Sequence, residues 1–394
     1  MHRRVLLKGL AAMPLAIVAG RLFAAPATRT KLLIVFLRGG YDAATLLVPI
    51  SSQLYYQART TIAVPRPGTD PHAALPLDSN WGLHPVLRET VYPLFQKQQA
   101  AFVAFAGTDD VSRSHFATQD SIELGQGLDR SRNFQSGFLN RLVSVLTGVG
   151  PMAFTDQLPL VFRGDAQVPN MALKALGKPG LDTRQSRIIA EMYKDTHLAA
   201  HVREGFGVRD EVLRELASEM ESANRQAITS KGFELEAHRI ATLMHEQYNL
   251  GFVDVGGWDT HVGQGGAVGY LASRLDELGR GLAGFADAMG AAWSETVVVV
   301  ISEFGRTMRE NGNRGTDHGH GTVYWVLGGA IRGGRVVGEQ VHVEQGTLFQ
   351  DRDYPVLNEY RRMFGGLFAR LYGLSSGQLD RVFAGVRPRD LGLI

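Results

Sequence analysis

Five short runs of apolar residues recur along the chain, and each has the length of a buried β-strand. Unbroken apolar runs, without alternating polar positions, are typical of strands that are covered on both faces, as in a parallel sheet. The runs are Lys31–Leu37, Ala101–Ala106, Leu250–Val255, Thr296–Ile301 and Thr322–Leu327. They predict a central sheet in which most strands are parallel.

Segments with apolar residues at helical spacing lie between these runs. Arg209–Tyr248 and Val268–Ala291 are the longest, and His115–Leu124 is a shorter one. The alternation of strands and helices favours an α/β fold, a three-layer sandwich with helices on both faces of the central sheet. We expect one such domain over residues 28–394, with a cap or insert around residues 148–235, where turn-forming residues are frequent at the start.

The first 27 residues have the pattern of an export signal. Residues 3–8 fit the Arg-Arg-x-apolar-apolar-Lys form of a twin-arginine signal, an apolar stretch follows from Gly9 to Gly20, and small residues near Ala25 offer cleavage points. A membrane-spanning helix needs about 20 apolar residues, whereas this run is shorter and contains Pro14. We expect the twin-arginine translocase to export the protein to the periplasm or beyond, without a stable membrane anchor.

The charge and cysteine content limit the possible partners and metals. The chain has 41 basic and 39 acidic residues, and residues 1–27 hold four of the basic ones and no acid. The remainder has a net charge of −2, from 37 basic and 39 acidic residues, so its charge gives no reason to expect nucleic acid. There is no cysteine, so any metal must be held by His, Asp or Glu.

Polar residues suited to metal binding follow the apolar runs or directly precede the last one. Ligands of open α/β sheets bind beyond the carboxyl ends of the strands, so we expect these loops to meet at one edge. Carboxylate and imidazole ligands from several loops suit a divalent cation, which we expect to be zinc, manganese or calcium, as one or two ions. The candidate metal ligands are Asp42, Asp259, His261, Glu303, Asp317, His318 and His320.

Each candidate also has a purely structural explanation. An aspartate after a strand, such as Asp42, often caps a helix. Asp259 and His261 can be a capping aspartate and a core histidine, and residues 317–320 can be a solvated polar loop. The clustering of these residues at strand ends favours the metal site over the separate structural explanations.

Residues 113–115 are the candidate catalytic residues. Ser114 precedes the predicted helix that begins at His115, where backbone N–H groups and the helix dipole favour an anion. The Ser114 hydroxyl is therefore either a metal-activated nucleophile toward a phosphate or sulfate ester or the N-cap of that helix. Arg113 is either an oxyanion clamp or an ordinary surface charge, and Arg306 is a second candidate for neutralising the transferred group.

Six motifs that occur in a fixed order make the chain resemble a known bacterial family. They are Gly-Gly-Tyr-Asp (39–42), Trp-Gly-Leu-His-Pro (81–85), Ser-Arg-Ser-His-Phe (112–116), Gly-Gly-Trp-Asp-Thr-His (256–261), Ser-Glu-Phe-Gly-Arg (302–306) and Thr-Asp-His-Gly (316–319). The chain resembles the family labelled "domain of unknown function 1501" from about Lys31 to the C-terminus. Members of that family commonly carry a twin-arginine signal.

That family in turn resembles a branch of the alkaline phosphatase and sulfatase superfamily. The resemblance implies a mostly parallel sheet between helices, with two metals at the strand ends and Ser114 near the nucleophile position. The metal ligands that it implies are Asp42, the Asp259–His261 pair, Glu303 in place of a strand-end Asp-His, and His318 with Asp317 or His320 assisting.

The chain departs from the superfamily pattern in two motifs and lacks one sulfatase feature. Asp259 and His261 are two residues apart instead of four, and Ser302-Glu303 replaces an Asp-His pair. The absence of cysteine removes the Cys-derived formylglycine of most sulfatases. The sequence predicts an exported metal-dependent hydrolase of phosphate or sulfate esters, acting on a small-molecule or polymer ester. The alternative is a non-catalytic secreted or surface module for binding or assembly on the same fold.

Overall fold

The structure is a computed structural model that describes residues 29–129, 131–173, 183–207 and 232–394. The predicted export signal, residues 1–27, lies outside the described residues, as do parts of the predicted cap or insert. Among the described residues, none of the helices is long and apolar enough to cross a membrane.

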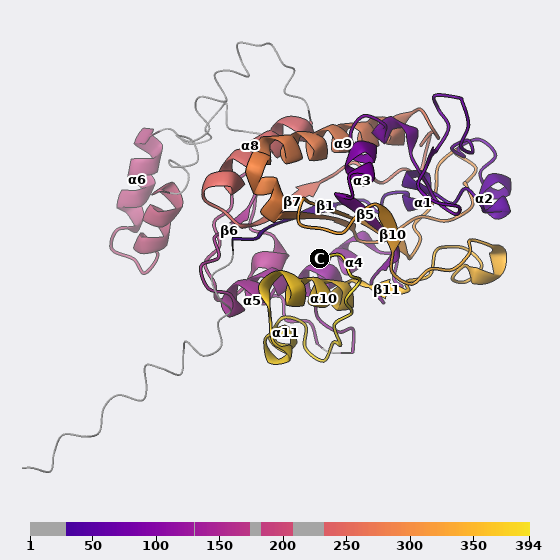
Figure 1. Cartoon of the computed structure of the whole chain (residues 1–394). Helices are drawn as coiled ribbons and strands as arrows, with labels where there is room; N and C mark the ends of the chain where they lie inside the picture. Colours follow the sequence, from indigo (N-terminus) through magenta and orange to yellow (C-terminus); the bar gives the residue numbers. More distant parts are fainter. Residues whose placement is uncertain (1–28, 130, 174–182, 208–231) are drawn as a thin grey trace, which may run out of the picture.

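An eight-stranded sheet forms the centre of the molecule (Figure 1). The strands lie in the order β10-β5-β9-β8-β1-β7-β6, and β11 pairs with β5. Their bounds are β1 Lys31–Leu37, β5 Ala100–Gly107, β6 Pro151–Ala153, β7 Leu250–Val255, β8 Thr296–Ser302, β9 Thr322–Leu327, β10 Arg335–Val337 and β11 Asn358–Glu359. The five predicted strands are confirmed. All neighbouring strands are parallel except where β9 pairs antiparallel with β5 and β8, so the sheet is mixed but mostly parallel, as predicted.

The direction of β9 decides where one of the polar loops lies. Since β9 runs opposite to β8 and β5, its N-terminal end lies at the edge where β1, β5, β7 and β8 end. The chain therefore goes from the end of β8 to the start of β9 without crossing to the opposite edge. Residues 316–320, just before β9, thereby join the loops that follow the parallel strands.

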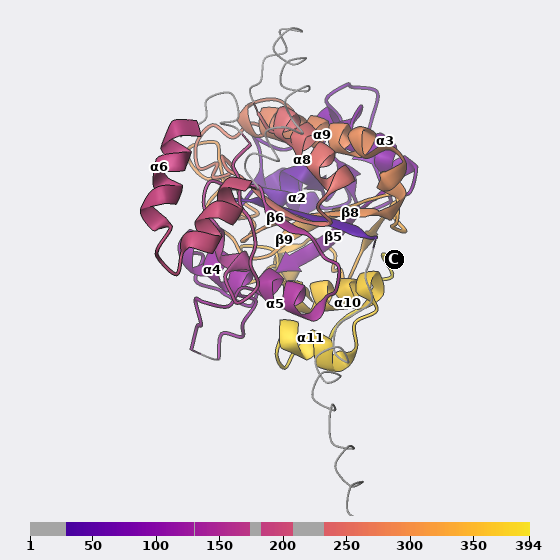
Figure 2. The same ribbon diagram turned by 90° about the vertical axis from the view of Figure 1, so that its left-hand side faces the viewer.

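Helices cover both faces of the sheet, which confirms the expected three-layer α/β sandwich (Figures 1 and 2). The helices on one face are α3 Val91–Gln96, α8 Phe233–Glu246 and α9 Tyr270–Met289. Those on the other face are α4 His115–Leu124, α5 Phe138–Val145, α10 Tyr360–Tyr372 and α11 Ser376–Val382. In β1, Leu33 and Val35 pack toward the first layer, whereas Leu32 and Ile34 pack toward the second. Because both faces of the strand pack against helices, its sequence is a continuous apolar run without alternating polar positions.

Smaller elements complete the fold. They are α1 Ala43–Leu46, α2 Gln53–Ala58, α6 Thr183–Tyr193, and a second, antiparallel sheet of β2 Leu47–Val48, β4 Gly82–Leu83 and β3 Leu75–Pro76. The first part of the predicted cap or insert belongs to the sandwich, because β6 pairs with β7 and the side chains of Val161 and Phe162 are buried in the core. The helix α6 lies at the side of the sandwich in both views (Figures 1 and 2).

Candidate metal centre

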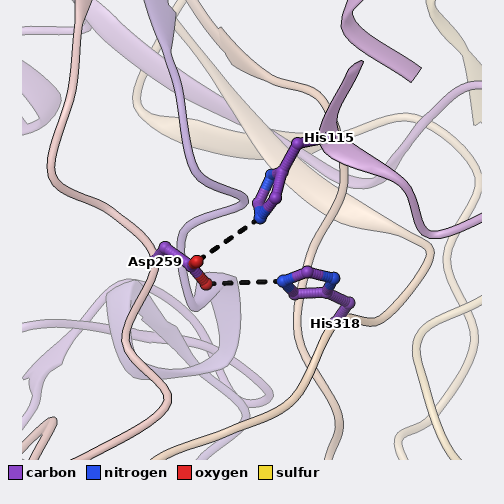
Figure 3. A group of neighbouring side chains, drawn as sticks. All are labelled: His115, Asp259 and His318. Carbon is purple, nitrogen blue, oxygen red and sulfur yellow. Dashed lines mark ion pairs between the residues drawn. The ribbon is translucent and has the colours of Figure 1, made fainter. Parts of the chain in front are cut away.

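Three histidines meet one aspartate at the edge of the sheet where the parallel strands end. His115 begins α4, Asp259 and His261 follow β7, and His318 precedes β9. The His115 and His318 rings point toward the carboxylate of Asp259 (Figure 3). The Nε2 atoms of His115, His261 and His318 lie 3.5, 3.0 and 3.4 Å from its oxygens.

Each imidazole has its Nδ1 atom beside an oxygen that can only accept a hydrogen bond. The three pairs are His115 Nδ1 with Glu303 Oε1 at 2.8 Å, His261 Nδ1 with Asp317 Oδ1 at 3.2 Å, and His318 Nδ1 with the Arg113 carbonyl oxygen at 3.0 Å. Because carboxylate and carbonyl oxygens do not donate, each Nδ1 carries the proton. In a neutral ring, Nε2 then has a free lone pair.

Among the described residues, a donor lies near only one of these lone pairs: Arg306 Nη1 is 3.5 Å from His261 Nε2, at the limit of a hydrogen bond. His261 Nε2 and His318 Nε2 lie 3.0 Å apart, so two lone pairs face each other unless a cation or an added proton lies between them. His115 Nε2 is buried and has no hydrogen-bond partner within the part of the chain that the structure describes. Metal-ligating histidines have this arrangement, with Nδ1 donating to a carboxylate or carbonyl and the other nitrogen free for the ion.

Asp259 completes this group as an ionised carboxylate. Its Oδ1 atom accepts a hydrogen bond from Arg306, whose side chain is fully buried. Burial alone would raise the pKa of Asp259, but the hydrogen bond and charge of Arg306 outweigh burial and lower the pKa. Ligand atoms of His115, Asp259 and His318 all lie within 4.8 Å of one another, which is a donor set for a divalent metal, and His261 lies beside Asp259 and His318.

Glu303 lies behind His115 and does not face the Asp259 carboxylate. Its Oε1 atom accepts hydrogen bonds from Gly39 N, His115 Nδ1 and Gln119 Nε2, each at 2.8 Å, and its Oε2 accepts one from the neighbouring Ser302 hydroxyl. Burial alone would raise the pKa of Glu303, but these hydrogen bonds outweigh burial and lower the pKa. The structure therefore gives this predicted ligand the place of a partner that orients His115.

Asp42 is not brought to the histidines. Its carboxylate is buried in a two-pronged ion pair with the Arg59 guanidinium and also accepts hydrogen bonds from Thr45 and Gln264. Burial alone would raise its pKa, but the charge and hydrogen bonds of Arg59 lower it. Asp42 also caps α1 by accepting a hydrogen bond from the Ala44 N–H. Its alternative explanation, a helix-capping aspartate, therefore accounts for this residue.

The remaining metal candidates also lie outside the group that faces Asp259. Asp317 accepts hydrogen bonds from His261 Nδ1 and Asn311 Nδ2, and the bond from Asn311 contributes most to its lowered pKa. His320 is buried against the Phe349 ring, with 4.8 Å between ring centroids, and burial lowers its pKa. The structure thus gives Asp317 the place of a partner to His261 and separates His320 from the group.

The three predicted catalytic residues have different surroundings, and His115 is the one that faces Asp259. Ser114 is exposed and occupies the N-cap position of α4, but its hydroxyl makes no capping hydrogen bond. The Arg113 guanidinium binds Asp353 and Gln350, with Nη2 distances of 2.7 and 2.8 Å. The side chain of Arg113 is thus anchored in the protein, while its backbone carbonyl orients His318.

Arg306 ties several loops together and thereby positions Asp259. Besides Asp259, its guanidinium donates to the carbonyl oxygens of Gly39, Gly40 and Thr316. Arg306 Nη1 also lies 3.5 Å from His261 Nε2, and the positive charge of Arg306 favours the neutral form of the His115 and His318 rings. The supporting residues Gln119, Asn311 and Asp353 were not predicted, since none lies in a motif that marks a metal site.

The fold and the site define an α/β sandwich with a centre of histidines and one aspartate at the edge where its parallel strands end. Residues 29–383 match the family described as "Protein of unknown function (DUF1501)". The chain belongs to this family, as predicted. None of the curated proteins matches the chain.

Two solved structures show distant likeness to the chain. A protein in the alkaline phosphatase superfamily from Vibrio parahaemolyticus aligns with a TM-score of 0.40 and 12% identity, over 89% of this chain and 68% of that one. Ps i-CgsB, in complex with k-i-k-neocarrahexaose, aligns with a TM-score of 0.38 and 8% identity, over 92% of this chain and 75% of that one. At these levels the likeness says nothing about function, for which the geometry of the site is the basis.

Proposed function

We propose that this protein is a metal-dependent hydrolase of phosphate or sulfate esters. One observation carries the proposal: three imidazoles, each anchored through Nδ1, direct their Nε2 atoms at the ionised carboxylate of Asp259. Residues His115, Asp259, His261 and His318 would hold the metal. The unpartnered His115 Nε2 and the 3.0 Å contact between the other two Nε2 atoms support this fit.

The donor set favours zinc or manganese among the three metals expected from the sequence. Imidazole is a common ligand of zinc, and a set with one carboxylate also suits manganese. Calcium takes oxygen ligands, so a site with histidine nitrogens fits it poorly. We therefore propose zinc or manganese as the bound metal.

Residues around the cluster provide the other parts of a hydrolytic site. A divalent cation bound here would polarise the ester and lower the pKa of a nearby hydroxyl. Ser114 is our candidate nucleophile, because its hydroxyl is exposed and is not used to cap α4. The first N–H groups of α4 favour the charged phosphate or sulfate group. Glu303 and Asp317 keep His115 and His261 oriented.

A panel of substrates tests the proposed activity. Purified full chain is loaded with zinc or manganese and assayed against aryl phosphates, phosphodiesters and aryl sulfates. We expect turnover of at least one class and a loss of at least about 100-fold in kcat for Ser114→Ala, since a nucleophile acts only in the chemical step. Absence of turnover from every class, with metal measured in the protein, would contradict the proposal.

The second candidate function is a non-catalytic binding or assembly module. The observation that favours it is that both arginines predicted to contact an oxyanion are paired within the protein, Arg113 with Asp353 and Arg306 with Asp259. This candidate predicts a loaded metal site without turnover in the same assay.

We also propose that the protein is exported through the twin-arginine pathway, on the pattern of residues 3–8. Cell fractionation with Arg3→Lys and Arg4→Lys combined tests it. We expect the wild type in the periplasm or medium and the double variant in the cytoplasm. If the wild type and the double variant are found in the same compartment, this export route is contradicted.

A further inference from the structure

A pocket of about 250 Å³ lies beside the candidate metal centre. Asp317 connects the two, because it lines the pocket and accepts a hydrogen bond from His261 Nδ1. The pocket is bounded by α2, residues 307–310 and residues 345–352. The pocket and the histidines are therefore neighbours, with Asp317 between the pocket and the His261 ring.

The lining of the pocket combines apolar and polar side chains. Leu54 and Met308 are among the apolar residues, and the polar residues that can contact a ligand include Arg309, Gln345, Asp351 and Arg352. We find no side-chain partner for the exposed Arg309 guanidinium among the residues that the structure describes. Arg352 contacts Asp353 at 3.4 Å and is itself about 39% exposed. Both guanidinium groups therefore have donors for a ligand.

The charges of the lining argue against a second phosphate or sulfate in the pocket. Three carboxylates, of Glu310, Asp317 and Asp351, outnumber the two guanidinium groups. Burial alone would raise the pKa of Glu310, but hydrogen bonds from Thr60 and Thr61 outweigh burial and lower the pKa. The Glu310 carboxylate therefore stays ionised. A lining with more negative than positive charge repels anions, whereas mixed donors and acceptors match hydroxyl groups, which both donate and accept.

We propose that this pocket binds the polyhydroxylated alcohol half of the ester, a sugar ring or a related cyclic polyol. Arg309 and Arg352 donate to its hydroxyl oxygens, and Asp351 and the Gln345 side chain accept from its hydroxyl hydrogens. The volume of about 250 Å³ is just below the roughly 300–1,000 Å³ of small-molecule sites and fits a single ring. This inference rests on the proposed function for the position of the ester, but binding of the polyol itself requires no metal.

Polyol binding is tested on the metal-free full chain by saturation-transfer NMR, with methyl glucoside, methyl galactoside and myo-inositol as probes. We expect at least one probe to bind, and a loss of about tenfold or more in affinity for Arg309→Ala and for Arg352→Ala, as for removal of a hydrogen bond from a charged donor. The matched control is Arg381→Ala, at an exposed arginine of α11 on the other layer of the sandwich, which should bind as the wild type does.

The outcomes separate this inference from the proposed activity. If no probe binds, or if both pocket variants bind the probes as tightly as the wild type, the pocket proposal is wrong. If the probes bind at the arginines but no ester is hydrolysed by metal-loaded protein, the proposed activity is wrong and the polyol pocket stands. If aryl esters are hydrolysed but no polyol binds, the proposed activity stands and the pocket proposal is wrong.

Discussion

At the scale of single residues, the centre depends on contacts that fix which nitrogen of each histidine is free. His318 is oriented by a backbone carbonyl, that of Arg113, which is held at a positive φ of 53°. A residue other than glycine in this conformation carries a strain of about 1–3 kcal/mol. The anchor that holds it is the ion pair between the Arg113 guanidinium and Asp353, whose side chain is fully buried.

We predict that Asp353→Asn weakens metal binding about tenfold, at the low end of the roughly 10–100-fold cost of losing an outer partner. Removal of the charge loosens Arg113, so its carbonyl no longer holds His318 Nδ1. The measurement is a calorimetric titration with zinc, and Arg113→Ala should show a loss of similar size. Wild-type affinity in both variants would show that the anchor does not position His318.

His115 gives two pH dependences of opposite sign. The hydrogen bond to Glu303 contributes most to its raised pKa, and partial burial works against it. In metal-free protein, a folded pKa above the unfolded value of about 6.5 means that this contact stabilises the fold fully below that value. The stabilisation is lost as pH rises through the folded pKa. Metal binding needs the neutral ring, so metal affinity increases over the same range.

We therefore predict that metal-free wild type loses its stability advantage over His115→Asn as pH rises above about 6.5. Metal affinity of the wild type should increase meanwhile. Urea unfolding of both metal-free proteins at several pH values measures the first effect, and zinc titrations measure the second. An advantage that stays constant or grows with pH would contradict the assigned contact with Glu303.

At the scale of elements, the apolar runs identify strands but not their direction. The β9 run resembles that of β8, because both strands are covered on both faces, yet the two are antiparallel. Periodicity does not encode direction, since the same faces are buried either way. The strands β6, β10 and β11 escaped prediction because they have only two or three residues, and β11 is Asn-Glu, which carries no apolar signal.

The loops at the site come together closely enough to require glycine at position 39. Gly39 has a φ of +125°, and a Cβ atom there would lie 2.7 Å from the backbone nitrogen of Asp259. We predict that Gly39→Ala destabilises the protein by about 1–3 kcal/mol and weakens metal binding, because the loop that carries Asp259 must shift. Gly312→Ala is the matched control, since a Cβ atom at Gly312 meets no atom of the described residues within 4 Å. Equal stability of the two variants in urea unfolding would contradict this packing argument.

At the scale of the whole molecule, the buried pair of Asp42 and Arg59 stabilises the fold without taking part in the centre. We predict that Asp42→Asn lowers the free energy of unfolding by about 3–5 kcal/mol, because the buried guanidinium loses its counter-charge. Metal stoichiometry should stay as in the wild type. The test combines urea unfolding with metal analysis, and loss of metal from a folded Asp42→Asn variant would restore Asp42 as a ligand.

The sequence predicted the sandwich and which loops meet, but not the division of roles among the polar residues. Asp42 and Asp259 both follow a parallel strand, so their positions in the sequence are equivalent. They differ because Arg59, 17 residues after Asp42, takes that carboxylate. Glu303 and His318 likewise lie at the same edge, and only the side-chain directions show that Glu303 orients a histidine. Such pairings depend on three-dimensional packing and leave no periodic signal.

The most direct test of the account is the metal content of the full chain after loading with zinc or manganese, measured beside two variants. We predict about one equivalent in the wild type, near-complete loss in Asp259→Asn, and wild-type content in Asp42→Asn. Bound metal should also raise the thermal stability, and chelation should reverse the increase. Less than about half an equivalent in the folded wild type, with no change in stability on chelation, would contradict the proposed centre.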